Sequence, residues 1–299
     1  MGPERTARTV VTWCSLLTGG KEERVGSRVP VIGHIVHCNR DAPHRWELAT
    51  IEALSRQTVA AGALPVVISD VETEPTDAIL QALRRGVVDA LAVTAFSCRT
   101  LWVDELVRSG MPVMMIGPHA TASLPFVTID GRAAMESLVH HLAGQGRRRI
   151  GLIAARTPRG DMASRVDGWR RGLAEAQLLQ DDQLMIEGDL TSESGAQAAI
   201  ELWRRQADAI IAVTDPMARG AIRALEESGV DVPADVAVAG IDGAGPLDGL
   251  LTTVCQPFDL IAETIITELL IQLDGGASSP ETLLLGDLSI GSSTVTTGV

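Results

Sequence analysis

The chain has 299 residues, of which 45% are hydrophobic and 21% charged, and this composition is typical of a soluble globular protein. Its formal net charge of −13 argues against a nucleic-acid-binding body, because contact with phosphates needs a basic face. The length corresponds to about two domains, and such a chain can bury its core without disulfides or structural metals.

Residues 1–28 differ from the rest, since they carry five basic and three acidic side chains. We expect them to form a basic leader. The apolar run at residues 10–17 is at the short limit for a signal peptide, and no small-residue cleavage site follows it. No run reaches the ~18 apolar residues of a membrane span. We therefore expect a cytoplasmic protein that makes no contact with a membrane.

Short runs rich in Val and Ile alternate with helical patterns over the first half of the chain. The predicted strands cover residues 29–36, 64–69, 87–94, 112–116 and 126–129. The predicted helices between and after them cover residues 46–61, 75–85, 101–109 and 130–145. This alternation predicts a parallel sheet covered by helices on both faces.

The alternation then starts again and predicts a second set of the same kind. Its strands cover residues 149–154, 184–187, 209–213 and 236–241. Its helices cover residues 162–176, 192–205 and 215–228. The two sets predict two similar doubly wound α/β lobes.

The tail is too small for a third lobe. It contains one helix, at residues 258–273, and short extended pieces at 252–254, 283–285 and 288–290. These elements must complete the earlier lobes, so the chain crosses between them three times. We predict a first lobe from residues 29–146 and 257–286, and a second from 147–256 and 287–299. Two lobes joined in this way form a hinged cleft, a natural ligand site.

Six stretches of the sequence, in order, resemble the effector-binding core of the LacI/GalR family, whose fold is that of periplasmic sugar-binding proteins (type I). The stretches are 146–153 (GRRRIGLI), 165–169 (RVDGW), 187–195 (EGDLTSESG), 213–221 (VTDPMARGA), 224–242 (ALEESGVDVPADVAVAGID) and 251–258 (LTTVCQPF). The resemblance covers residue 29 to the end of the chain.

The resemblance implies the effector-sensing core of a transcriptional regulator that forms a homodimer and is not an enzyme. Its effector would be a sugar, a polyol or another small polar molecule that closes the lobes and so controls DNA binding. Residues 1–28 could be a hinge remnant, but they are too few for the family's helix-turn-helix. Operator DNA is therefore a partner only if such a domain lies upstream. The alternatives are a solute-binding receptor of a transport system, which would carry a signal or lipid-attachment site, and an α/β enzyme.

Two residues of the second lobe match ligand-binding positions of the family. Arg165 begins a helix and offers five fixed donors to hydroxyl groups, although a helix arginine can also be simply solvated. Asp242 ends a predicted strand, where ligands of α/β proteins bind, although it could instead cap a loop.

Three further candidates lie at helix starts. Asp130 matches a first-lobe aspartate of the family, but it serves equally well as a helix N-cap. Asp161 precedes Arg165 by four residues and could likewise be a cap. Thr214 stands where the family often has Asn, and we expect the following Asp215 to be an N-cap.

Two departures from the family concern aromatic side chains. Leu190 occupies a position that often stacks an aromatic ring on the ligand. Trp46 remains as the one aromatic candidate of the first lobe, although it could simply pack at a helix start.

The sequence shows no metal, cofactor or catalytic motif. His34 and His37 would point to opposite faces of a strand, so they cannot converge on a metal with Cys38 and His44. Lys21 is the single lysine, which excludes a Schiff base or a nucleotide-binding lysine elsewhere. Residues 147–149 are three consecutive arginines that we expect at a solvated lobe junction and not on DNA.

Overall fold

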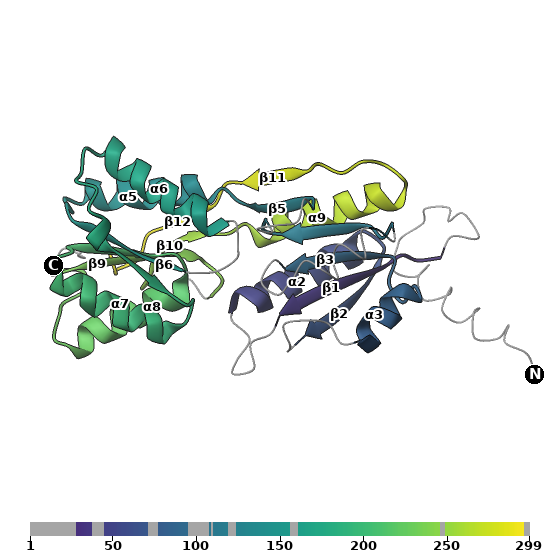
Figure 1. Ribbon diagram of the computed structural model, residues 1–299, viewed down its shortest axis with the longest axis horizontal. Coiled ribbons are helices and arrows are strands. Elements are labelled where there is room, and N and C mark those ends of the chain that lie inside the picture. The colour runs from purple at the N-terminus through teal and green to yellow at the C-terminus, as the bar shows by residue number, and fades with distance from the viewer. Residues whose placement is uncertain are drawn as a thin grey trace, which may run out of the picture.

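The computed structural model describes residues 28–37, 45–70, 77–94, 108, 110–118, 124–155, 161–245 and 249–295. Residues 1–27, Cys38, His44 and most of the helix predicted at 101–109 lie outside the described residues. The described part forms two α/β lobes side by side along the long axis of the molecule (Figure 1), which confirms the predicted fold class.

The first lobe is built on a six-stranded parallel sheet. Its strands, in spatial order, are β11 (Glu281–Leu284), β5 (Phe126–Ile129), β4 (Val113–Ile116), β3 (Ala90–Thr94), β1 (Val31–His37) and β2 (Leu64–Asp70). Strands β3 and β4 are buried along their whole length, as expected for the centre of a parallel sheet. Helices α2 (Arg45–Ala60) and α9 (Phe258–Leu273) pack on each other and on this sheet, whereas α3 (Asp77–Arg84) buries Leu83 in the apolar cluster of the other face.

The second lobe has the same design with one difference. Its sheet has the order β12 (Asp287–Ser289), β10 (Thr252–Cys255), β9 (Ala237–Asp242), β8 (Ala209–Ala212), β6 (Ile150–Ala155) and β7 (Met185–Gly188). All neighbours are parallel except the edge strand β12, which pairs with β10 in the antiparallel sense. A short 3₁₀ turn, η1 (Asp182–Leu184), leads into β7.

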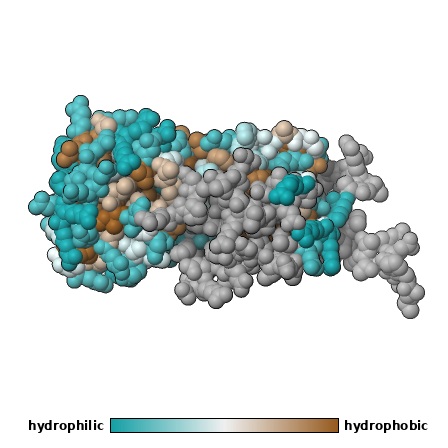
Figure 2. Space-filling model, viewed as in Figure 1, coloured by the Kyte–Doolittle hydropathy of each residue, from teal (hydrophilic) through white to brown (hydrophobic). Residues whose placement is uncertain are grey.

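Four helices cover the second sheet. In Figure 1, α5 (Gly131–Gly144) and α6 (Asp161–Glu175) lie above it, and α7 (Ser192–Arg204) and α8 (Asp215–Glu227) lie below it. The face of this lobe seen in Figure 2 is mainly hydrophilic.

Helix α5 belongs to the second lobe, and this differs from the lobe boundary that we predicted after residue 146. It packs against α6 and the strands β8, β9, β10 and β12. A side chain at Gly168 would collide with the backbone of Arg132, so glycine allows α6 to approach α5 closely. An ion pair of 2.8 Å between Arg132 and Asp167 adds to the contact. The first crossover therefore lies at Asp130, between β5 and α5.

The chain crosses between the lobes three times within its described part. The second crossover is the short link Gln256–Pro257 between β10 and α9, and the third is Leu285–Gly286 between β11 and β12. The backbone N–H of Asp130 donates to Leu284 O at 2.8 Å, so the first and third crossovers lie side by side.

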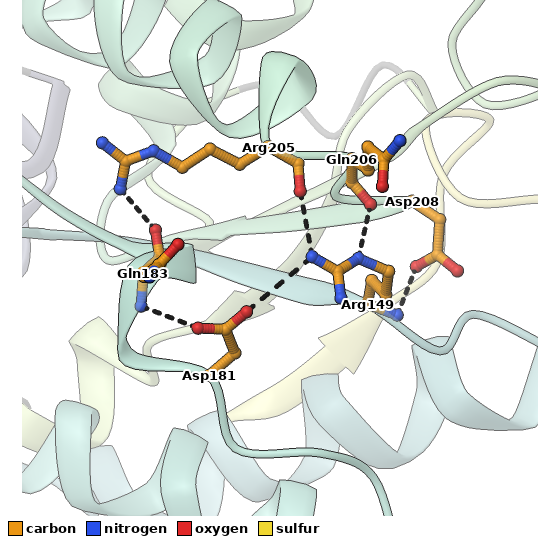
Figure 3. A network of polar contacts seen from close by, with 6 residues as sticks. All are labelled: Arg149, Asp181, Gln183, Arg205, Gln206 and Asp208. Atoms are coloured by element: carbon orange, nitrogen blue, oxygen red, sulfur yellow. Dashed lines mark hydrogen bonds and ion pairs between the residues drawn. The ribbon is translucent and has the colours of Figure 1, made fainter.

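The arginines at positions 147–149 were expected at the lobe junction, and this prediction is wrong. They precede β6 and so sit at the amino-terminal edge of the second sheet, opposite the edge where β9 ends in Asp242. Arg149 donates to Gln206 O at 2.9 Å and to Arg205 O at 3.0 Å, and it lies 3.8 Å from Asp181 (Figure 3). Arg149 therefore holds the carbonyl groups at the end of α7.

Arg149→Ala should lower the free energy of unfolding by about 1–2 kcal/mol, because it removes charged hydrogen bonds to carbonyl groups that are partly exposed. The matched control is Arg148→Ala, in which an exposed neighbouring guanidinium is removed. Urea unfolding of both variants measures the effect, and equal stabilities would contradict this role of Arg149.

His34 in β1 is fully buried against α2. Its Nε2 lies 3.1 Å from Thr58 Oγ1, which itself donates to Leu54 O at 2.7 Å. Thr58 Oγ1 must therefore accept from Nε2, a bond that the neutral and the charged imidazole can both make. Burial lowers the pKa of His34 from 6.5 to about 4.

Because the pKa of His34 is lower in the folded state, the unfolded chain binds the proton first as the pH falls. The stability that neutral His34 provides is complete above pH 6.5 and is lost by pH 4, a change of about 3 kcal/mol. We expect His34→Asn to lack this part of the acid dependence. Urea unfolding from pH 7.5 to 4 compares the two proteins, since all other titrating groups are common to both, and parallel curves would refute the assignment.

Candidate functional site

A cavity of about 300 Å³ lies between the lobes, at the carboxyl end of β9. The first lobe contributes Arg45 and Trp46 from the first turn of α2, and the second lobe contributes all other lining residues. These are Ser192, Asp215, Pro216, Arg219, Asp242, Ala244 and Gly245. The cavity thus brings together two of the predicted site residues, Trp46 and Asp242, and it lies at the strand ends where ligands of α/β proteins bind.

Asp242 is held in a strained backbone conformation at this cavity. Its φ angle of +149° falls in a region that L residues rarely adopt, and only 5% of its surface is exposed. Its carboxylate Oδ1 accepts a 2.9 Å hydrogen bond from Gln256 Nε2, and its carbonyl accepts from the backbone N–H of Gln256 at 3.0 Å. The surrounding protein therefore fixes both the side chain and the backbone of Asp242.

Asp215 is not the N-cap that we predicted. Thr214 occupies the N-cap position of α8, and Asp215 instead binds the neighbouring strands. Its Oδ1 accepts from Thr253 Oγ1 at 2.6 Å, and its Oδ2 accepts from Gly243 N at 2.9 Å. Burial raises the pKa of Asp215, and these hydrogen bonds and the nearby Arg219 oppose the rise.

Thr214 lies beside this network without joining it. Its side chain makes no capping hydrogen bond, and its buried hydroxyl has no hydrogen-bond partner among the described residues. A buried hydroxyl without a partner is costly, so an additional polar group at this position would stabilise the site.

Trp46 packs at the start of α2, which is one of the two alternatives that the sequence left open. It is 92% buried and meets Phe258 edge to face, with ring centroids 6.4 Å apart. It also lines the cavity from the first lobe. The packing against Phe258 therefore fixes the position of the indole ring at this wall of the cavity.

Arg165 is buried inside the second lobe, with 2% of its surface exposed. Its Nη1 donates to Val213 O, and its Nη2 lies 3.4 Å from Asp161 Oδ2. Neither of the two cavities described here has Arg165 in its lining. In this structure the guanidinium thus joins the start of α6 to the end of β8.

Asp130 and Asp161 lie on a second cavity of about 310 Å³, next to the crossover between β5 and α5. Strands β5 and β11 of the first lobe form one wall, and the first turns of α5 and α6 form the other. Asp130 caps α5, since its Oδ1 accepts from Ala133 N at 3.0 Å. Four of the seven predicted candidates therefore divide between two cavities of the lobe junction, and Arg165, Thr214 and Leu190 line neither of them.

Leu190 lines neither cavity. Its φ angle of +72° places it in a left-handed turn after β7, where its partly buried side chain packs on the core. The sequence, on the other hand, did not single out Arg45, Ser192 or Gln256. The positions of Ser192 at a helix start and of Gln256 directly after a strand were the available signals, but such positions are common.

The residues that the structure describes include no group of three His, Cys, Asp or Glu side chains that could hold a metal ion. Within the same residues, no helix is both long and apolar enough to cross a membrane. His37 is described only as part of the backbone of β1.

Comparison with known proteins gives consistent results. Residues 139–294 match the periplasmic binding protein-like domain family. The HTH-type transcriptional regulator reg1 of Streptomyces lividans is 31% identical over 248 residues, which are 77% of this chain and 69% of the relative.

Solved structures show the same fold. The complex of the transcriptional regulator CelR with cellobiose has a TM-score of 0.78 at 23% identity, over 98% of this chain and 91% of that one. A regulatory protein of the LacI family from Chloroflexus aggregans has a TM-score of 0.74 at 25% identity, over 86% of this chain and 96% of that one. The chain therefore belongs to the LacI/GalR family of transcriptional regulators.

Proposed function

We propose that the cavity between Trp46 and Asp242 binds a small polyhydroxylated effector, whose binding closes the lobes and controls the binding of operator DNA. The observation that carries the proposal is the strain at Asp242. A non-glycine residue at φ +149° costs of order 1–3 kcal/mol, and such residues cluster at ligand sites. A glycine would be cheaper at this position, so the carboxylate must provide something that glycine cannot.

The lining suits a sugar. Trp46 offers an apolar ring, Asp242 offers acceptor oxygens, and Arg45, Arg219 and Ser192 offer donors. The two walls come from different lobes, so a ligand that touches both is bound better when the lobes are closed. Such a difference in affinity shifts the population toward the closed arrangement.

The second cavity extends the proposal to Asp130 and Asp161. Both carboxylates lie between elements of the two lobes, so an effector that reached them would also favour closure. Arg165 would orient Asp161 and add donors if the effector enters between the cavities. Thr214 would gain the hydrogen-bond partner that its buried hydroxyl lacks.

The relatives support the kind of effector and the assembly that we propose. The solved CelR structure contains cellobiose, which makes a disaccharide the first ligand to test. A lac repressor solved with operator is a dimer and has the same fold, with a TM-score of 0.77. We infer that this chain acts in the cytoplasm as a homodimer, and that it senses a sugar as a regulator and not as an enzyme.

Asp242→Gly tests the proposal, because it should relieve the backbone strain and remove the carboxylate at the same time. We expect binding of the effector to weaken at least about tenfold, since one hydrogen bond to a charged group contributes roughly 1.5–3 kcal/mol. The unfolding temperature should fall less than in a variant that breaks the bond to Gln256 without relieving the strain, because the relief of strain offsets part of the lost bond.

The measurement is a thermal-shift screen of the full chain with cellobiose, maltose, glucose, ribose and a polyol panel, followed by calorimetry on each hit. Asp274→Gly is the matched control, since this exposed aspartate has an ordinary φ of −81°. That variant should bind as the wild type does and lose stability. If no compound shifts the wild type, or a hit binds equally well to Asp242→Gly, the proposed site is wrong.

A further inference from the structure

Gln256 makes two hydrogen bonds to the cleft residue Asp242. Its side-chain Nε2 donates to Asp242 Oδ1 at 2.9 Å, and its backbone N–H donates to Asp242 O at 3.0 Å. Gln256 is itself 91% buried, so water does not compete strongly for these bonds. It also lies outside the secondary structure, in the two-residue crossover between β10 of the second lobe and α9 of the first.

The same crossover reaches the other wall of the cavity. Phe258, the first residue of α9, donates its backbone N–H to Gln256 O at 3.0 Å and packs edge to face against Trp46. Helix α9 in turn packs on α2 and on strands β3, β4 and β5 of the first lobe. Residues 256–258 thus contact Asp242 on one side of the cavity and Trp46 on the other.

A crossover must change its dihedral angles when two lobes move relative to each other. The other two crossovers, at Asp130 and at Leu285–Gly286, make no hydrogen bond to Asp242 in the described structure. Among the described crossovers, only the one at Gln256 is bonded both to the strained strand end and, through Phe258, to the first-lobe wall.

We propose that Gln256 is a positioning residue, which orients the carboxylate of Asp242 and couples it to the crossover. The Asp242–Gln256 pair sets the resting angle between the lobes, and a ligand that engages Asp242 shifts this angle through the pair. The sensing part of the inference rests on the proposed function, whereas the pair and its effect on the lobes do not need a ligand.

An exchange of the two groups tests the pair. In Gln256→Glu two carboxylates face each other at pH 7.5, so the equilibrium constant of unfolding should rise by about tenfold or more. Asp242→Asn combined with Gln256→Glu restores an amide donor opposite a carboxylate. The double variant should return to within about threefold of the wild type, which simple packing at position 256 would not explain.

The matched control is Gln272→Glu, near the other end of α9, where the amide bonds to the backbone of Val113. The stability lost in Gln272→Glu should simply add to the stability lost in Asp242→Asn, and combining the two substitutions should restore none of it. Urea unfolding of the full chain gives these constants. Small-angle scattering without ligand should show a larger radius of gyration for Gln256→Glu and a wild-type value for the exchanged pair.

The inference would be overturned if the two substitutions of the exchanged pair lowered the stability additively. It would also be overturned if Gln256→Glu had the radius of gyration of the wild type. If Gln256→Glu does not fold, a cycle of Gln256→Ala and Asp242→Asn measures the same coupling, and additivity there has the same meaning. Failure of every sugar to bind would overturn the proposed effector site but not these results, so the two failures are distinguishable.

Discussion

The peptide group between Asp242 and Gly243 is held at both ends, and the cleft depends on this arrangement. Gln256 N–H donates to the carbonyl side, and Asp215 accepts from the N–H side. The following Gly243 has a φ of +62°, and a side chain there would collide with Cys255. One strained turn thus joins the ends of β9 and β10 to the start of α8 and to the crossover.

The strained turn is stabilised by buried polar groups, and their burial has a free-energy cost of its own. Asp215 must lose most of its hydration to reach Gly243 and Thr253, which is why burial raises its pKa. Its two hydrogen bonds and the nearby Arg219 compensate this loss in part. The network therefore keeps the Asp242 carboxylate in place. In a flexible loop the same side chain could turn toward solvent.

The close helix contacts of the second lobe give the turn a rigid support. Helices α7 and α8 approach each other at Gly195 and Gly220, where any side chain would collide with the facing backbone. Because Asp215 is the first residue of α8, this contact also fixes the group that holds the strained turn. The first lobe is joined to the second through three short crossovers, so a rotation of one lobe against the other would need dihedral changes in only a few residues.

The sequence by itself determined the two mostly parallel sheets, because buried strands appear as continuous apolar runs whatever they pair with. It also placed Asp242 at a strand end and Trp46 at a helix start, since both follow from the local pattern. Only the tertiary structure decided that α5 belongs to the second lobe and that Arg165 bonds to Val213 and Asp161. It also decided that Gln256 bonds to Asp242, and that Asp215 bonds to the following Gly243. Hydrogen-bond partners such as Asp215 and Thr253 lie 38 residues apart, and no local pattern records which distant groups the packed sheets bring within 3 Å of each other.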